Sequence, residues 1–161
     1  MASSPDGTRG ARLYRLIKQK YARQALAGRG GLEADGRWHS AGRPIVYLAS
    51  SEALAVLEVR VHLGSVVPVD PYTLLTIELP GRLIDVLARE QWPRGWDAVP
   101  FGPASQRVGD RWLAAARGVA LRVPSVHSSS DFNVLFNSAH AAASRARIVG
   151  RGRYAFDVRL F

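Results

Sequence analysis

Short apolar runs alternate with turn-forming residues along most of the chain. The runs at 44–49, 72–79 and 119–126 are rich in β-branched and aliphatic residues, which predicts three strands. Residues 11–27 begin with a strand-like pattern and are expected to continue as a helix. In the final segment, RYAFDVRLF at 153–161, apolar and polar positions alternate, which predicts a last strand with one buried face. The residues expected on that face are Tyr154, Phe156, Val158 and Leu160.

Two segments carry the start and stop signals of helices. Ser50 and Ser51 offer N-caps for a helix over SEALAVLEVRVHL, and Gly64 is expected to end it. Further along, Ser105 is expected to cap a helix through RWLAAARG that ends at Gly118. Serine suits the start of a helix because its hydroxyl accepts a hydrogen bond from a free N–H of the first turn.

The connections between these elements are long and irregular. Residues 28–43, GRGGLEADGRWHSAGR, are rich in glycine and lack apolar periodicity, which predicts a loop. Residues 91–105 contain several prolines and two tryptophans and predict an irregular connection, while 83–88 fits either a strand or a helix start. Short strands and helices without regular strand–helix–strand alternation indicate an α+β fold with a mixed sheet.

Length and composition indicate one globular domain. The chain has 161 residues, of which 47% are hydrophobic and 22% charged. We expect residues 1–10 to be a disordered tail and residues 11–161 to form the domain. No stretch approaches the ~18 apolar residues of a spanning helix, and the N-terminus lacks the apolar core of a secretory signal, so the cytoplasm is the expected location. The absence of cysteine excludes a thiolate metal site and a cysteine nucleophile.

The chain is strongly basic. Lys and Arg number 22 against 13 Asp and Glu, a formal net charge of +9. Such a charge suits nucleic acid, a phosphate-bearing small molecule or an acidic protein. The arginines are scattered, which disfavours nucleic acid. The densest group, RARIVGRGR at 145–153, is interpreted as a solvated turn before the last strand.

Glu58 is the most informative single residue. On the predicted helix its neighbours three and four positions away are mostly apolar, so its carboxylate lies on the apolar face. A charge there is costly unless it is paired or used. Position alone leaves two interpretations equal: a structural pair with Arg15, Arg37 or His62, or a carboxylate directed into a cleft.

Three other polar residues are candidates for the same site, namely Arg37, Tyr47 and Ser125. Arg37 lies in the glycine-rich loop, where backbone can approach a ligand and a guanidinium can face phosphate oxygens. This loop leads into the strand bearing Tyr47 and then into the helix bearing Glu58, so three polar side chains can converge on one cleft. Tyr47 is expected either in the core with a bonded hydroxyl or stacked on a planar ring. Ser125 follows a strand end, and no Ser–His–Asp spacing accompanies it.

The histidines and asparagines carry weaker signals. The four histidines show no paired metal spacing, so no metal site is predicted. Asn133 and Asn137 lie in DFNVLFNSAH, where capping and turn roles are favoured. The chain also lacks a Walker loop and a GxGxxG motif, so nucleotide binding by those routes is not indicated.

These segments together resemble the RES domain. The stretch from LYR through GRW and VYLA to the glutamate of ALAVLE follows the family's order, and LRVPSV and the N-x-L-x-N-x-x-H pattern follow later. Arg37, Glu58 and Ser125 occupy the three positions for which the family is named. The resemblance covers residues 13 to about 161. The chain departs from the family pattern at Ser138, where proline usually follows asparagine, and at His39, where asparagine usually follows Arg-Trp.

The resemblance implies a toxin of the RES–Xre toxin–antitoxin class, with a fold similar to ADP-ribosyltransferases of the diphtheria-toxin type. Such a toxin cleaves the nicotinamide–ribose bond of NAD+, with water or inorganic phosphate as the acceptor and without a metal. Arg15 and Arg37 would hold the pyrophosphate, Tyr47 would stack on nicotinamide, and Glu58 would stabilise the charged ribose. The catalytic residues implied are Arg37, Glu58 and Ser125. The binding residues implied are Arg15, Arg37, Tyr47, Ser125 and Asn133.

Three further expectations accompany this reading. The implied partner is an Xre-like helix-turn-helix antitoxin that occludes the cleft, with no membrane and no direct nucleic-acid binding by this chain. Within the same chemistry, transfer of ADP-ribose to a protein is the first alternative. A non-enzymatic nucleic-acid-binding module, suggested by the net charge, is the second.

Overall fold

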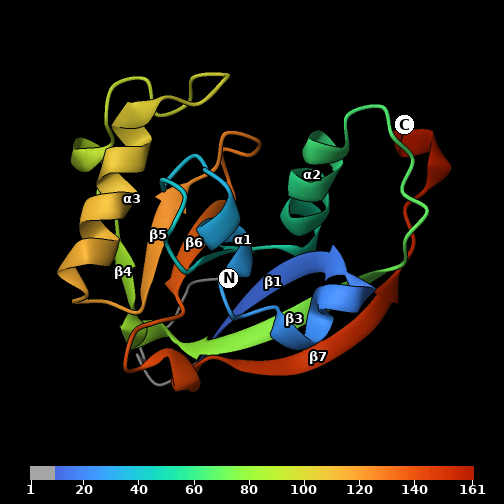
Figure 1. Cartoon of the computed structure of the whole chain (residues 1–161), viewed down its shortest axis with the longest axis horizontal. Helices are drawn as coiled ribbons and strands as arrows, with labels where there is room; N and C mark the ends of the chain where they lie inside the picture. Colours follow the sequence, from blue (N-terminus) through green and yellow to red (C-terminus); the bar gives the residue numbers. More distant parts are fainter. Residues whose placement is uncertain (1–9) are drawn as a thin grey trace.

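The computed structural model describes residues 10–161 (Figure 1). The tail expected at 1–10 lies outside the described residues except for Gly10, which begins the first strand. The strands are β1 (Gly10–Lys18), β2 (Ile45–Ala49), β3 (Tyr72–Pro80), β4 (Ile84–Val86), β5 (Ala120–Pro124), β6 (Phe132–Asn137) and β7 (Arg147–Tyr154). The α-helices are α1 (Arg29–Glu33), α2 (Glu52–Leu63) and α3 (Pro103–Ala115). Short 3-10 turns η1 (Gln19–Gln24) and η3 (Arg89–Gln91) follow β1 and β4.

The seven strands form one mixed sheet in the order β4-β5-β6-β2-β1-β3-β7. Neighbouring strands are antiparallel except β4 and β5, which run parallel. The strands predicted near 44–49, 72–79 and 119–126 are all present, and 83–88 contains β4. The α+β fold is therefore confirmed.

The two longer helices cover the same face of the sheet, α2 over one half and α3 over the other (Figure 1). On this face Leu54 of α2 packs near Ala49 of β2, and Leu113 of α3 packs near Leu121 of β5. The opposite face buries a second apolar cluster, which includes Ala25 after η1. Strand alternation therefore decides whether a side chain lies under the helices or on the far side.

Helix α2 begins and ends as predicted, whereas α3 does not. Ser51 caps α2, because its Oγ accepts a hydrogen bond from the N–H of Leu54 at 3.1 Å. Helix α3 has Gly102 as its N-cap and Pro103 in its first turn, so the prediction that Ser105 caps it is wrong. Proline suits this position because its fixed φ is helical and it has no N–H to satisfy. The predicted end at Gly118 is also wrong, since the helix ends at Ala115 and Ala116 adopts a φ of 50°.

The C-terminal prediction is wrong in its boundaries. Strand β7 occupies most of the basic segment 145–153, which is therefore not a turn. It ends at Tyr154, opposite Tyr72, because Tyr72 is the first residue of its partner β3 and no ladder continues beyond it. Phe156 packs edge-on against Tyr72 instead, with ring centroids 5.3 Å apart. The remaining two residues of the predicted apolar face, Val158 and Leu160, are exposed.

Two other segments also differ from expectation. The loop predicted at 28–43 contains the five-residue helix α1. Asn133 lies in strand β6 rather than in a cap or turn, and its Nδ2 donates to the carbonyl of Leu48 at 3.5 Å. Asn137 does take a turn role at the end of β6, where its Oδ1 accepts a hydrogen bond from the N–H of Ala139 at 3.2 Å. Among residues 10–161, no helix has the length and apolar character needed to cross a membrane.

Candidate functional site

Most of the predicted site residues lie on the helix-covered face of the sheet. Tyr47 is on β2 and shares its face with Ala49, two residues later. Asn133 of β6 pairs with both Ala49 and Val123, which places it on the same face. Ser125 directly follows β5, and Glu58 is on α2, which covers this face. The site therefore draws on a loop, three strands and a helix that meet on one side of the sheet.

Arg37 is anchored by one edge of its guanidinium. Its Nη1 donates to the carbonyls of Trp96 and Ala98, both at 2.8 Å, and its Cζ lies 5.8 Å from the ring centroid of Phe101. Within the described residues, its Nε and Nη2 make no hydrogen bond. Burial lowers the pKa of this guanidinium, while the nearby charges of Glu58 and Asp97 oppose that shift. Arg37 is thus a fixed cation that keeps two donor positions for a ligand.

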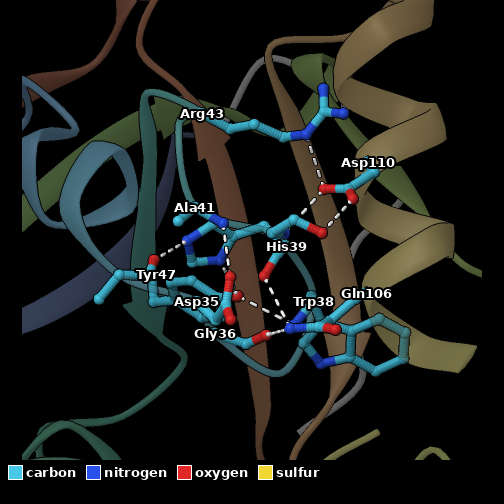
Figure 2. A network of polar contacts seen from close by, with 11 residues as sticks. Asp35, Gly36, Trp38, His39, Ala41, Arg43, Tyr47, Gln106 and Asp110 are labelled. Atoms are coloured by element: carbon cyan, nitrogen blue, oxygen red, sulfur yellow. Dashed lines mark hydrogen bonds and ion pairs between the residues drawn. The ribbon is translucent and has the colours of Figure 1, made fainter. Parts of the chain in front are cut away.

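A buried chain of hydrogen bonds holds the loop that carries Arg37 (Figure 2). The hydroxyl of Tyr47 accepts from the backbone N–H of Trp38 at 3.0 Å and lies 2.8 Å from Nδ1 of His39. His39 Nε2 lies 2.9 Å from the carbonyl of Ala34, so Nε2 carries the proton and Nδ1 accepts from Tyr47. His39 is only 3% exposed, and this burial lowers its pKa. Burial also raises the pKa of the Tyr47 hydroxyl, which keeps its proton.

Helix α3 holds the same loop from the other side (Figure 2). Nε2 of Gln106 donates to the carbonyls of Gly36 and His39, at 3.2 and 3.3 Å. One turn later Asp110 accepts from the N–H and hydroxyl of Ser40, at 2.9 and 2.6 Å. These two side chains are four residues apart and share one side of the helix. The structure thus clamps residues 36–40, and Arg37 with them, between β2 and α3.

Two further contacts tighten this clamp. Arg43 Nε lies 2.8 Å from Asp110 Oδ1, which adds an ion pair to the hydrogen bonds from Ser40. Burial alone would raise the pKa of Asp110, but those contacts hold it below the ordinary value. Gly109 allows the close approach, because a Cβ at this position would lie 1.6 Å from the carbonyl oxygen of Trp38. No other residue fits there without moving the helix or the loop.

A third segment links Glu58 to Ser125. His127 Nε2 lies 3.6 Å from Glu58 Oε2, and both side chains are partly exposed. The backbone N–H of His127 donates to Ser125 Oγ at 3.1 Å, which leaves the Ser125 hydroxyl proton for another acceptor. Sequence reasoning considered His127 only as a metal ligand and missed this contact. Its position two residues after Ser125, at a strand end, was the available signal.

None of the three ion pairs considered as one interpretation of Glu58 forms within residues 10–161. Arg15 and Arg37 do not form an ion pair with it there, although the charge of Glu58 acts on Arg37. His62 contacts the backbone rather than the carboxylate, with Nδ1 2.7 Å from the carbonyl of Glu58. The imidazole of His127, in the loop after β5, approaches the carboxylate instead, and this contact is an ion pair only when the imidazole is protonated.

A hollow of about 740 Å³ lies beside these residues. Its lining includes Ser125 and His127 on one side and Trp96 and Asp97 on another. Arg37 and Glu58 are not among its lining residues, but Arg37 donates to the carbonyl of Trp96 and Glu58 lies 3.6 Å from His127. Ser125 itself is 7% exposed. The hydroxyl of Ser125 therefore lines a space large enough for a small-molecule ligand, and the Arg37 cation and the Glu58 carboxylate each lie one contact away from its wall.

Arg15 is not brought together with the others. Tyr14 pairs with Ala49 on the site face, so the next residue, Arg15, points to the opposite face, where it pairs with Leu75. Its guanidinium donates to the carbonyl of Ala25. Burial lowers the pKa of Arg15 to about 10. Among residues 10–161 no cluster of three His, Cys, Asp or Glu side chains could hold a metal ion.

The comparisons with known proteins agree with this fold. The chain superposes on a chain of the crystal structure of the Mycobacterium tuberculosis MbcT–MbcA toxin–antitoxin complex with a TM-score of 0.63. The match covers 92% of this chain and 86% of that chain at 17% identity, which shows a shared fold. The model of the RES domain matches residues 12–157. The family match over residues 12–157 thus defines a RES-domain protein.

Sequence relatives place the chain within that family. It is 38% identical over 125 residues to "Toxin Res" of Photorhabdus laumondii, covering 78% of this chain and 80% of the relative. It is 44% identical over 129 residues to "Toxin Res" of Pseudomonas putida, covering 76% and 84%. It is also 38% identical over 144 residues to "Prs ADP-ribosylating toxin" of Sphingobium sp., covering 87% and 89%. The chain belongs to the RES family of toxins.

Proposed function

We propose that this RES toxin cleaves the nicotinamide–ribose bond of NAD+, with water or inorganic phosphate as the acceptor, and thereby depletes NAD+. The observation that carries the proposal is that Ser125 lines the hollow while Arg37 and Glu58 each contact another lining residue, Trp96 and His127 respectively. Each residue supplies a group that this reaction needs, as the following steps set out.

The reacting bond joins C1′ of ribose to the ring nitrogen of a cationic nicotinamide. When this bond breaks, its electron pair goes to the ring nitrogen, nicotinamide leaves as a neutral molecule, and positive charge develops on the ribose. The carboxylate of Glu58 is the group suited to stabilise that charge, as in glycoside cleavage. Water bonds to C1′ through its oxygen and releases a proton to solvent, which gives ADP-ribose. Inorganic phosphate bonds through an anionic oxygen and gives a phosphorylated ADP-ribose without losing a proton.

The remaining residues would bind and orient the substrate. The free donors of Arg37 suit the pyrophosphate, because a guanidinium can hold two phosphate oxygens at once. Tyr47 can offer only its ring to nicotinamide, since its hydroxyl is already bonded to Trp38 and His39. The free proton of the Ser125 hydroxyl suits a carbonyl or ribose oxygen. Asn133 shares this face of the sheet, whereas Arg15 lies on the opposite face.

The test is a product assay. Purified protein is incubated with NAD+ with and without phosphate, and nicotinamide, ADP-ribose and phosphorylated ADP-ribose are separated by chromatography. Nicotinamide release in either condition supports the proposal, and the second product identifies the acceptor. Intact NAD+ after long incubation in both conditions contradicts it.

Transfer of ADP-ribose to a protein is a second candidate. The relative named "Prs ADP-ribosylating toxin" is 38% identical to this chain, and transfer uses the same bond cleavage with a protein side chain as acceptor. Incubation of a cell lysate with labelled NAD+ separates the two functions. Labelled protein favours transfer, whereas label confined to free ADP-ribose or its phosphate favours depletion.

We further propose that an antitoxin controls this activity in the cytoplasm. The support is the shared fold with a chain of the MbcT–MbcA toxin–antitoxin complex, together with the net charge of +9, which suits an acidic partner segment. A helix-turn-helix protein of the Xre type is the expected partner. Co-expression of an adjacent Xre-type protein should relieve toxicity, and toxicity that persists with every neighbouring gene product contradicts this partner.

A further inference from the structure

Strand β7 runs along one border of the molecule and has a free edge (Figure 1). It pairs with β3 from Arg147 to Tyr154, and among residues 10–161 no strand pairs with its other side. The outward N–H and C=O groups of its backbone are therefore available to another strand. The hollow is lined by residues of β4, β5 and β6, toward the other end of the sheet. The free edge is thus separate from the hollow and does not depend on the proposed function.

Two arginines make this edge cationic on one face of the sheet. Arg151 pairs with the buried Leu75, and Arg153 follows two residues later, so both side chains lie on the face opposite the helices. Both are exposed, and within residues 10–161 neither forms an ion pair. Arg147, at the start of the strand, already has Glu78 at 3.8 Å. The unbalanced charge of β7 therefore lies at Arg151 and Arg153.

The backbone around these arginines is regular and accessible. The irregularity in the ladder with β3 lies between Thr76 and Ile77, so the five pairs from Gly150 to Tyr154 are in continuous register. A bulge normally weakens pairing at an edge, but this one leaves a run as long as a typical strand. Between the two arginines, a Cβ at Gly152 would meet no atom within 4 Å. A partner strand can therefore approach residues 150–154 without a steric barrier at that position.

These features favour an acidic peptide strand over other anions. A peptide strand supplies both donors and acceptors, which a free edge needs, whereas the phosphate backbone of DNA supplies acceptors alone. Carboxylates two residues apart on an added strand would face Arg151 and Arg153, and opposite charges across neighbouring strands stabilise pairing. The ring of Tyr154 packs edge-on against Phe156 at 5.1 Å, so residues 150–154 offer no free aromatic surface for nucleobases. A second copy of β7 would place arginine against arginine, which opposes self-pairing.

We propose that the outer edge of β7, from Gly150 to Tyr154, binds an extended acidic segment of a partner protein as an added strand. Backbone hydrogen bonds along the edge supply the affinity, and carboxylates placed against Arg151 and Arg153 supply the specificity. The net charge of +9 attracts such a segment before contact is made. Because β7 lies at the end of the sheet opposite β4, the hollow stays open while this partner is bound.

The test measures binding of a short labelled peptide in which glutamate alternates with threonine. Fluorescence anisotropy gives its affinity for the wild type and for the double variant Arg151→Glu/Arg153→Glu. The control is Arg29→Glu/Arg107→Glu, which makes the same charge change at exposed positions on α1 and α3. We expect the β7 variant to bind the peptide about tenfold more weakly than the control does, because two attractive cross-strand pairs become repulsive.

A second peptide separates strand addition from charge attraction. It has the same sequence with N-methyl groups on its backbone amides, so it keeps every carboxylate and loses its N–H donors. We expect this peptide not to bind the wild type. Amide hydrogen exchange at residues 150–154 should slow in the presence of the first peptide and stay unchanged with the second, because only an added strand protects the amides of the edge.

Three results would overturn the inference. The first is failure of the unmethylated peptide to bind the wild type, or equal binding by the two double variants. The second is equal binding of the methylated peptide, which shows charge attraction only. The third is displacement of the peptide by single-stranded DNA as effectively as by unlabelled peptide, which assigns the edge to nucleic acid. Circular dichroism checks the fold, and if the glutamate variant of β7 is unfolded, Arg151→Gln/Arg153→Gln decides, with severalfold weaker binding expected.

Discussion

Arg37 and Arg15, which the sequence assigned to the same task, lie on opposite faces of the sheet. Arg37 is held by two backbone carbonyls through one nitrogen, and within residues 10–161 its Nε and Nη2 make no hydrogen bond. Arg15 donates to the carbonyl of Ala25 among the apolar side chains of the far face. The difference teaches that an arginine serves binding when the structure fixes it and leaves donors free. Burial alone makes it a structural residue.

The largest effect is expected at Glu58, on the helix-covered face of the sheet that carries the candidate site. Replacing Glu58 with Gln removes the negative charge and keeps the size, so nicotinamide release from NAD+ should fall about 10²–10³-fold. The same substitution at the exposed Glu52, on the same helix, is the control and should have little effect. Rates are compared by a chromatographic assay of nicotinamide. Equal activity of the two variants would remove Glu58 from the mechanism.

The contrast between Arg37 and Arg15 is tested by replacing each of these two arginines with methionine. Arg37→Met loses charge-assisted hydrogen bonds to the substrate worth about 1.5–3 kcal/mol, so its KM for NAD+ should rise about 10–100-fold. Arg15→Met should change KM less than twofold, because its side chain lies on the far face. Steady-state kinetics give both values. A large rise in KM for Arg15→Met would show that the far face contributes to binding after all.

A smaller effect is expected from the contacts by which helix α3 holds the loop at residues 36–40. Asp110→Asn removes the charge that binds Ser40 and Arg43, which should lower stability by about 1–3 kcal/mol. Because the loop also carries Arg37, KM for NAD+ should rise severalfold while kcat changes less. Denaturant unfolding and kinetics measure the two effects. Asp157→Asn is the control, because Asp157 is exposed and its ion pair within residues 10–161 is with Arg159.

The smallest expected effect is a pH dependence of stability from His39. Burial lowers the pKa of His39 in the folded state, so the unfolded state binds more protons once the pH falls below the ordinary histidine value. Its contribution to stability is therefore present above about pH 6.5 and decreases as the pH falls toward the folded-state pKa. His39→Asn should flatten this part of the curve. Urea unfolding between pH 5 and 8 tests it, and identical curves for both proteins would contradict the assignment.

Much of the site was predictable because local signals agree with the fold. Glycine around Arg37, the β-branched strand with Tyr47 and the serine cap before α2 each follow from residue type, and together they place Arg37 and Glu58 on one side of the sheet. Arg15 was misplaced because the face of a residue depends on pairing register, which strand pattern alone does not give.

The remaining features that could not be predicted from the sequence depend on contacts between distant segments. His127 approaches Glu58 from a loop that is far away in the sequence, and Trp96, whose carbonyl binds Arg37, lies in a connection with no regular pattern. Strand β7 was missed because alternating arginine and glycine give no apolar period, although its pairing with β3 defines it. In each case the deciding partner lies elsewhere in the chain, so no local pattern could identify it.

The arginines of β7 influence how two copies of this chain can associate. This strand forms an open edge of the sheet and carries Arg147, Arg151 and Arg153, all exposed. An open edge can template the addition of another strand, and an identical edge is the nearest complement. Pairing two such edges would bring like charges face to face, which opposes it. The positive charge along β7 therefore opposes edge-to-edge association of this chain into fibre-like sheets at high concentration.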